Sequence, residues 1–219
     1  MSSSSTLVTA AHFAYLAERT HREDAFLAEA KRAAVAAGIP AIWISPEQAS
    51  LMAILLRLCR AREVIEVGTL AGTTAIGMAR ALPPGGRVRS IELEPAHVAF
   101  ARQWVARSDV AERVEVHEGR GVDVLPTFAD DSADAAFLDA DKSSYPAYLD
   151  EAVRIVRPGG LIMVDNAFAF GQLFDETPTD GEVGAVRAFN DRMANDPRVD
   201  GIIVPVGDGM WVAVNRRDG

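Results

Sequence analysis

The sequence lacks several features that would assign it to a particular class of protein. It contains one cysteine, Cys59, which excludes an intrachain disulfide and a zinc site built from several cysteines. We expect Cys59 to be a small buried side chain in a helix. No apolar run approaches the length of a membrane span, and the first ten residues lack the basic and apolar regions of a secretory signal. These absences predict a cytoplasmic protein with no membrane contact.

Positive charge is also scarce. Lysine and arginine total 22 against 31 aspartates and glutamates, which gives a formal net charge of -9. Nucleic-acid-binding proteins usually present a basic surface to the phosphate backbone. The acidic balance therefore argues against a nucleic-acid partner. The hydrophobic fraction of 49% and the charged fraction of 24% are those of an ordinary globular protein.

Composition divides the chain into three parts. Residues 1–8 are rich in serine, and we expect them to form a disordered polar tail. Residues 9–60 have apolar positions at helical spacing and predict N-terminal helices, with a break near Thr20 to Arg22. Residues 61–219 predict an α/β core. Residues 9–219 together are short enough to form a single domain.

The last of the N-terminal helices has a clear start. Ser45 can cap it, Pro46 fits its first turn, and Gln48 completes a capping box with Ser45. We expect this helix to extend to Leu58.

From residue 63 onward, short apolar runs alternate with helical segments. This alternation predicts a doubly wound α/β fold, in which helices cover both faces of a mostly parallel sheet. A glycine-rich turn at 207–209 separates the last two of seven strands and predicts an antiparallel C-terminal hairpin at one sheet edge. The predicted strands are Val64 to Val67, Val88 to Leu93, Val114 to Val116, Ala135 to Leu138, Leu161 to Val164, Gly201 to Val206 and Met210 to Asn215. The predicted helices between them are Thr73 to Leu82, Pro95 to Ala106, Val122 to Phe128, Tyr145 to Val156 and Glu182 to Met193.

Ligands bind beyond the carboxyl ends of the strands in such a sheet. The first strand ends in a loop that reads Glu-Val-Gly-Thr-Leu-Ala-Gly-Thr-Thr over residues 66–74 and opens a helix. Gly68 and Gly72 allow the backbone to approach a ligand, and a helix N-terminus attracts a carboxylate. The spacing differs from the G-x-G-x-x-G dinucleotide motif. A plain glycine turn is the alternative interpretation.

Glu92 strengthens the ligand hypothesis for this loop. It ends the second strand, 20 residues after Gly72, where a carboxylate can accept hydrogen bonds from both hydroxyls of a ribose. The alternative is a solvated charge at a strand end. The loop and Glu92 together predict a cofactor that contains a nucleoside, and Gly121, after the third strand, is expected to border its adenine.

Acidic and amide side chains follow two later strands. Asp139 follows the fourth strand, and Asp165 and Asn166 follow the fifth. Adjacent parallel strands end side by side, so these three side chains could converge. Three oxygen donors with open positions suit magnesium or a similar hard cation. The alternative is turn chemistry, because Asp and Asn commonly close strand-to-helix loops.

Lys142 lies three residues after Asp139. A lysine that is partly desolvated near a cation has its charged form disfavoured, which favours a role as general base. The alternative is an ordinary surface lysine. The histidines do not group around this region, and we interpret all four as structural or solvent-facing: His12, His21, His97 and His117.

In combination, these motifs resemble the cation-dependent class I O-methyltransferases, the group of caffeoyl-coenzyme A and catechol O-methyltransferases with their bacterial relatives. The resemblance covers roughly residues 44–216. It implies an enzyme that uses S-adenosylmethionine and has the methyltransferase variant of the doubly wound fold. It rests on Ile-Ser-Pro-Glu-Gln over 44–48, the 66–74 loop, Ile-Glu over 91–92, Leu-Asp-Ala-Asp-Lys over 138–142, Val-Asp-Asn over 164–166, Asp-Pro-Arg over 196–198 and Pro-Val-Gly-Asp-Gly over 205–209.

Carried over to this sequence, the resemblance implies a role for each motif. It implies a divalent cation, Mg2+ or another such as Mn2+ or Ca2+, held by Asp139, Asp165 and Asn166. Lys142 would be the catalytic base, the acceptor a small catechol or phenol, and the protein a homodimer. The implied cofactor contacts are Glu66, Gly68, Gly72, Thr74, Glu92, Gly121 and Asp139, and the acceptor contacts that we expect are Asp141, Tyr145 and Phe168.

Two segments depart from the family pattern. The loop after Gly68 lacks the aromatic residue that relatives often carry there. Ala-Phe-Ala-Phe-Gly follows Asn166, where the plant enzymes typically place a tryptophan. Phe168 and Phe170 remain able to stack on an aromatic acceptor.

Two other functions stay open. One is methylation of a hydroxylated uridine in tRNA, which the net charge of -9 disfavours. The other is a dehydrogenase-like nucleotide-binding protein, which the absence of G-x-G-x-x-G and the acidic strand ends disfavour.

Overall fold

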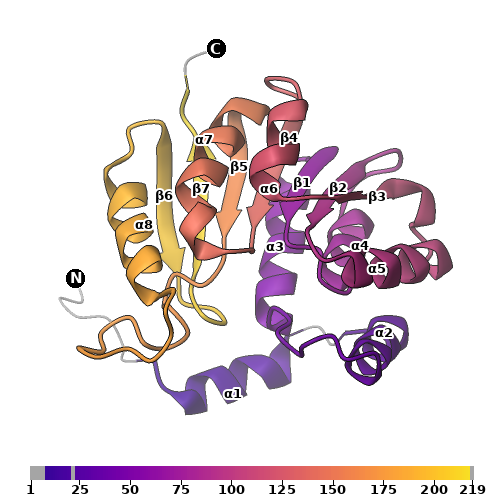
Figure 1. The fold of residues 1–219 in the computed structure, drawn as a ribbon, viewed down its shortest axis with the longest axis horizontal. Coiled ribbons are helices and arrows are strands. Elements are labelled where there is room, and N and C mark those ends of the chain that lie inside the picture. The colour runs from indigo at the N-terminus through magenta and orange to yellow at the C-terminus, as the bar shows by residue number, and fades with distance from the viewer. Residues whose placement is uncertain (1–7, 21–22, 218–219) are drawn as a thin grey trace.

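Seven strands of the described residues form one central sheet (Figure 1). The computed structural model describes residues 8–20 and 23–217. The strands are β1 (Glu63–Val67), β2 (Arg87–Glu92), β3 (Val114–Glu118), β4 (Ala133–Leu138), β5 (Val156–Val164), β6 (Val199–Val204) and β7 (Met210–Asn215). Their order is β3-β2-β1-β4-β5-β7-β6, in which β7 runs antiparallel between β5 and β6 while β1 to β5 are parallel. The sheet confirms the predicted doubly wound fold with its antiparallel C-terminal hairpin.

Helices surround this sheet and precede it (Figure 1). The α-helices are α1 (Ala10–Arg19), α2 (Ala25–Ala36), α3 (Pro46–Leu58), α4 (Thr73–Ala81), α5 (Pro95–Arg107), α6 (Gly121–Val124), α7 (Tyr145–Ile155) and α8 (Val183–Asn195). Single turns of 3-10 helix form η1 (Ala111–Arg113), η2 (Leu125–Thr127) and η3 (Lys142–Ser144). No helix in the described part of the chain is long and apolar enough to span a bilayer.

Hydrophobic side chains form a separate core on each face of the sheet. On one face, α3, α4 and α5 contribute side chains such as Met52 and Val98. On the other face, α7 and α8 contribute Leu149 and Phe189. Successive side chains of a strand point to opposite faces, so the strands are buried on both sides. Their carboxyl ends are the part of the sheet where polar side chains collect.

Some predicted boundaries shift for identifiable reasons. β5 begins at Val156 rather than Leu161, because Val156 already pairs with Ala133 of β4. The helix predicted from Val122 to Phe128 is split into α6 and η2, with Pro126 in the first turn of η2. Proline lacks the amide N–H that a continuous helix would use, so the division follows from the sequence.

The N-terminal helices follow the prediction in outline. The predicted break lies between α1 and α2, although residues 21–22 are outside the described part, as are residues 1–7 of the predicted tail. The capping box of α3 is present, with Gln48 N donating to Ser45 Oγ (3.2 Å) and Ser45 N donating to Gln48 Oε1 (2.9 Å). Cys59 follows α3 as its C-cap and is only partly buried, so the expected full burial of this cysteine is wrong.

Candidate active site at the carboxyl ends of the strands

A cavity of about 890 Å3 opens at the carboxyl ends of β1, β2, β4 and β5. It brings together most of the residues that the sequence singles out. Those that line the cavity are Gly68, Thr74, Glu92, Gly121, Asp139, Asp141, Lys142, Asp165 and Asn166. Those that do not line it are Glu66, Gly72, Tyr145 and Phe168.

The loop between β1 and α4 depends on glycine for its close contact with the neighbouring strand end. Gly68 has a φ of 105°, and a Cβ added there would lie 1.9 Å from the carbonyl oxygen of Asp139. Gly72 has a φ of 80° and is the N-cap of α4. L-residues with side chains rarely adopt this backbone conformation. The loop therefore holds the N-terminus of α4 against the cavity, where its amide N–H groups can bind an anionic group.

Glu92 is fixed at the end of β2 by backbone donors. Its side chain accepts hydrogen bonds from Leu70 N on Oε2 (2.7 Å) and from Glu94 N on Oε1 (2.9 Å). His97 Nδ1 lies 3.6 Å from Oε1, and His97 lines the cavity. His97 is thus a further residue of the cavity wall. Its place in the first turn of α5, five residues after Glu92, is the sequence signal that could have indicated this.

Glu66 lies behind the loop rather than in the cavity. Its side chain is completely buried, and its Oε2 accepts a hydrogen bond from Ser90 Oγ. Ser90 Oγ in turn lies 2.5 Å from Thr69 Oγ1, and Thr69 lines the cavity. Burial, and the negative charges of Asp139 and Glu92, raise the pKa of Glu66 to about 8. Sequence reasoning did not identify Ser90 and Thr69, because a serine in a strand and a threonine in a loop carry no distinctive signal.

Asp139 and Asp165 meet because their strands are in register. Leu138 pairs with Val164, so the residue after each lies at the same level, and Asp165 N donates to Leu138 O (3.1 Å). Burial, and the charge of Asp139, raise the pKa of Asp165 to about 7. Gln48 Nε2 donates to Asp165 Oδ1 at 2.5 Å, so one glutamine both caps α3 and orients this carboxylate.

Asn166 is held by a hydrogen bond from its amide nitrogen to Asp208. Its Nδ2 donates to Asp208 Oδ2 (3.1 Å), and Asp208 also accepts from Phe170 N (2.8 Å). Because the nitrogen is engaged, the amide oxygen Oδ1 is the atom that Asn166 can offer to a cation. No group of three or more His, Cys, Asp or Glu residues in the described chain is placed to hold a metal ion. The donor set is instead two carboxylates and one amide, an all-oxygen set that fits a hard cation.

Lys142 is buried beside this group, with 4% of its surface exposed. Its Nζ donates to Asp139 Oδ1 (3.0 Å) and to Tyr145 Oη (2.8 Å). Tyr145 is completely buried, and its hydroxyl donates to Asp165 O (3.3 Å). The structure thus places Tyr145 behind Lys142, where it positions the lysine and does not face the cavity.

The aromatic residues near the cavity differ from those expected. Phe168 packs against the turn at Gly209, where an added Cβ would lie 2.8 Å from its ring. Phe170 lines the cavity and is 38% exposed. Tyr148 lines it too, and donates to Asp141 Oδ1 (2.5 Å). Phe170, Tyr148 and Trp43 are therefore the Phe, Tyr and Trp side chains that a ligand in the cavity can meet.

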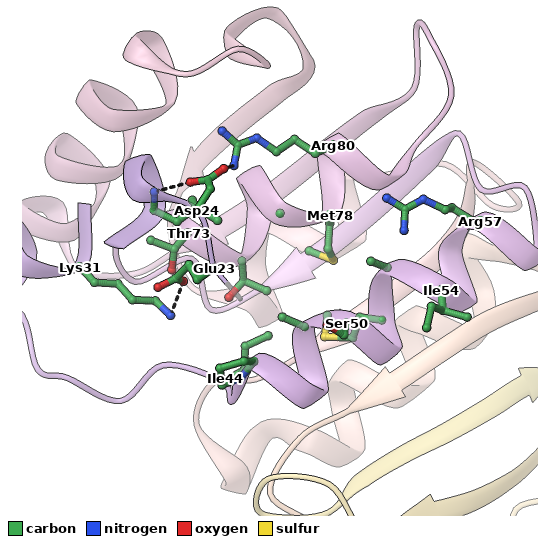
Figure 2. Close-up of a pocket in the computed structure, with 17 residues that line it drawn as sticks. Glu23, Asp24, Lys31, Ile44, Ser50, Ile54, Arg57, Thr73, Met78 and Arg80 are labelled. Carbon is green, nitrogen blue, oxygen red and sulfur yellow. Dashed lines mark hydrogen bonds and ion pairs between the residues drawn. The ribbon is translucent and has the colours of Figure 1, made fainter. Parts of the chain in front are cut away.

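A second, smaller hollow of about 380 Å3 lies between α2, α3 and α4 (Figure 2). Its acidic side chains are already paired, Glu23 with Lys31 and Asp24 with Arg80, each at 2.6 Å. Its floor is largely apolar, with Met78 pointing inward (Figure 2). Since no strand end contributes to its lining, it offers no converging catalytic groups.

The sheet order and the cavity define the class of protein. A glycine loop after β1, an acid at the end of β2 and acidic ends on β4 and β5 are the arrangement of a class I methyltransferase. The chain belongs to the O-methyltransferase family, whose family model matches residues 17–216. It is accordingly an enzyme of the O-methyltransferase class.

Individual relatives agree with this assignment. The chain is 38% identical over 208 residues to a catechol O-methyltransferase of Niastella koreensis, with 91% of this chain and 94% of that protein covered. It is similar to an O-methyltransferase from Bacillus cereus solved in complex with SAH, with a TM-score of 0.84, 33% identity, and 94% and 97% of the two chains covered. It is also similar to TomG of Streptomyces achromogenes, an O-methyltransferase of tomaymycin synthesis solved with SAM, with a TM-score of 0.82, 33% identity, and 94% and 96% covered.

The buried Glu66 carboxyl predicts a pH dependence of stability. Its pKa is about 8 in the folded protein and about 4.3 in an unfolded chain. Between these values the folded protein keeps a proton that the unfolded chain has lost. The contribution of Glu66 to stability is thus complete at low pH and declines as pH rises toward 8, by up to about 1.4 kcal/mol per pH unit.

Glu66→Gln removes this titration, so the variant should gain stability relative to the wild type as pH rises from about 5 to about 8. Urea unfolding of the cofactor-free proteins across this range measures the difference. Glu112→Gln, at an exposed carboxylate of η1, is the matched control and should follow the wild type. Parallel stability curves for Glu66→Gln and the wild type would contradict the assignment.

Proposed function

We propose that the protein transfers a methyl group from S-adenosylmethionine to a hydroxyl of a small catechol or phenolic acceptor, with the help of a divalent cation. The observation that carries the proposal is the composition of the 890 Å3 cavity, whose wall brings two kinds of group together. One part of its wall is the glycine loop with Glu92. The other part carries Asp139, Asp165 and Asn166, with Lys142 beside them.

The cofactor half of the proposal rests on the loop and the end of β2. Glu92 faces the cavity with a fixed carboxylate, which suits the two hydroxyls of a ribose. Gly121 borders the other side, where an added Cβ would lie 2.6 Å from the ring of Tyr148. Thr74 lines the cavity in the first turn of α4, where a ligand carboxylate would meet the helix N-terminus. Bound there, S-adenosylmethionine would supply an electrophilic methyl group.

The proposal of a cation site rests on two neighbouring carboxylates, Asp139 and Asp165, that have little positive charge beside them. The raised pKa of Asp165, about 7, reports that its burial and the charge of Asp139 disfavour ionisation. A divalent cation held by Asp139, Asp165 and the amide oxygen of Asn166 would remove this penalty. It would also supply positive charge that stabilises the deprotonated hydroxyl of an acceptor. Mg2+ is the proposed ion, with Mn2+ or Ca2+ as alternatives of the same hard class.

Lys142 is the residue proposed to take the acceptor's proton once it has itself lost one, because an ammonium group has no lone pair to accept it. Lys142 lines the cavity, and Asp139 and Tyr145 hold its Nζ in place. Phe170 offers a ring at the same wall for an aromatic acceptor. Transfer would then depend mainly on positioning of the two reactants and on handling of charge.

Methylation of tRNA is the alternative function, and the lining of the cavity does not favour it. The ionisable lining of the cavity is predominantly acidic, whereas a nucleic acid would require basic groups around the site. The acidic lining residues are Glu92, Glu94, Asp139, Asp141, Asp165, Glu182 and Asp208, against the basic residues Arg120 and Lys142.

Chelation tests the proposed function directly. The purified protein with S-adenosylmethionine and a panel of catechols, phenols and caffeoyl esters should yield a methyl ether. Activity should disappear with a chelator and return with added Mg2+. Asp165→Asn should lower turnover on the order of 100-fold while the affinity for S-adenosylhomocysteine changes little. Full activity in the chelator, or in Asp165→Asn, would refute the cation site.

Glu92 gives an independent test of the cofactor site. Glu92→Gln should weaken binding of S-adenosylhomocysteine by about 1–3 kcal/mol, the range for a lost charge-assisted hydrogen bond. Isothermal calorimetry measures the change, and Glu112→Gln, which lies outside the cavity, should bind like the wild type. Equal affinities for Glu92→Gln and Glu112→Gln would exclude Glu92 from the ribose site.

We further propose that the protein is a homodimer whose contact includes α1. No residue of α1 is buried, and Tyr15 and Leu16 are 58% and 40% exposed. On α3, Ile54 and Leu58 are also more than half exposed, at 52% and 75%. α1 and α3 contact each other, and exposed apolar side chains that form one continuous patch commonly mark a surface that a partner covers.

Light scattering should give twice the monomer mass for the wild type. Leu16→Glu with Leu58→Glu places charges on this surface, so that the double variant should move toward the monomer. A monomeric wild type at micromolar concentration would contradict the proposal.

A further inference from the structure

A chain of hydrogen-bonded oxygens runs from a buried carboxyl to the wall of the cavity. It consists of Glu66, Ser90 and Thr69, which are 0%, 0% and 2% exposed. Ser90 Oγ donates to Glu66 Oε2 and lies 2.5 Å from Thr69 Oγ1. Of the three residues, only Thr69 lines the cavity. The chain therefore connects a group that no ligand touches to one that a ligand can touch.

Strand pairing in the sheet brings the three side chains of this hydrogen-bonded chain together. Glu66 of β1 and Ser90 of β2 are direct partners in the parallel ladder, so their side chains leave the sheet on the same face. Thr69 reaches the same point because its amide donates to Ile91 O (3.2 Å), which ties the loop to β2. Glu66 Oε1, in contrast, is buried without a hydrogen-bond partner in the described structure. A buried carboxyl with an orphaned oxygen is costly when it is ionised.

The charged groups that face Glu66 are both negative. Asp139 faces it from the end of β4 and Glu92 from the end of β2. Lys142, the cation of the site, is bonded to Asp139 and Tyr145 instead. Burial first, and then the charges of Asp139 and Glu92, raise the pKa of Glu66 to about 8, so it holds a proton at neutral pH.

The direction of the hydrogen bonds between the two hydroxyls depends on whether Glu66 carries its proton. With Glu66 ionised, Ser90 donates to the carboxylate and Thr69 donates to Ser90, so Thr69 offers only lone pairs to the cavity. With Glu66 protonated, the direction can reverse, and Thr69 then presents its hydrogen to the cavity. A ligand that brings positive charge or N–H donors favours the first state. S-adenosylmethionine carries an ammonium and a sulfonium centre, so it belongs to this class.

We propose that Glu66, Ser90 and Thr69 form a proton relay by which cofactor binding expels one proton from the protein. The O–H bond of Glu66 breaks as its proton passes to Ser90, while the proton of Ser90 passes to Thr69 and that of Thr69 to water and buffer. No oxidation state changes, and the positive charge of the bound cofactor balances the new carboxylate. The inference rests on the proposed use of S-adenosylmethionine and adds a proton linkage to it.

Calorimetry in different buffers measures this proton. S-adenosylmethionine and S-adenosylhomocysteine are titrated into the protein near neutral pH, in buffers that differ in ionisation enthalpy. The dependence of the observed heat on that enthalpy gives the protons released. The wild type should release close to one proton per S-adenosylmethionine, and no more than this with S-adenosylhomocysteine, which lacks the sulfonium charge. Affinity should rise with pH between about 6 and 8, by up to about tenfold per unit.

Two variants and one spectrum complete the test. Glu66→Gln should abolish the release and flatten the pH dependence, whereas Glu112→Gln on the distant η1 should behave like the wild type. If Glu66→Gln fails to fold, infrared difference spectra of Asp165→Asn, which lacks the other carboxyl of raised pKa, decide the question, because the band of a protonated carboxyl should vanish on cofactor binding. Binding whose heat is independent of the buffer, with no loss of that band, overturns the relay but leaves the proposed function standing. Absence of any cofactor binding overturns the proposed function itself.

Discussion

Negative charge crowded at one edge of the sheet is the constraint around which the site is organised. Parallel strands in register bring Asp139 and Asp165 together. Glu92 ends β2, and Glu66 lies one residue before the end of β1. Burial, and after it the nearby like charges, disfavour ionisation of these carboxyls and raise the pKa values of Glu66 and Asp165. In the described chain, Lys142 is the cation bonded within this group. The site is therefore arranged to receive further positive charge from its ligands.

Residues outside the cavity hold the acidic groups in place. Gln48 connects the first turn of α3 to Asp165, Tyr145 supports Lys142, and Asp208 fixes Asn166. Such supporting contacts set the orientation of groups that meet the reactants, and their loss typically costs much of a site's activity. The N-terminal helices and the C-terminal hairpin thus contribute to the site although they lie outside the β1 to β5 core.

Much of this arrangement is readable from the sequence, for physical reasons. Alternating apolar runs and helical segments predicted the seven strands, and the turn at 207–209 predicted the reversal of β7. The residues after each strand predicted where polar groups collect, because parallel strands end at one edge. The capping box at Ser45 predicted the start of α3. These features are local, so a short stretch of sequence carries the necessary information.

The remaining features depend on contacts between distant segments. The link from Ser90 to Glu66 has no local pattern. Tyr145 was expected at the acceptor, but its position relative to η3 turns it behind Lys142. Phe168 was expected there as well, but the turn at Gly209 occupies its ring and leaves Phe170 at the cavity. Side-chain direction after a strand end depends on the packing of the next loop, which strand periodicity does not determine.

We propose that the acidic strand ends hold a hard cation next to a nucleoside cofactor. Anomalous scattering from crystals grown with Mn2+ and S-adenosylhomocysteine would locate such a cation. We expect one strong manganese peak between Asp139, Asp165 and Asn166, with the ribose of the cofactor on Glu92. A cofactor bound in the cavity with no manganese peak at these three residues, or with the peak elsewhere, would contradict it.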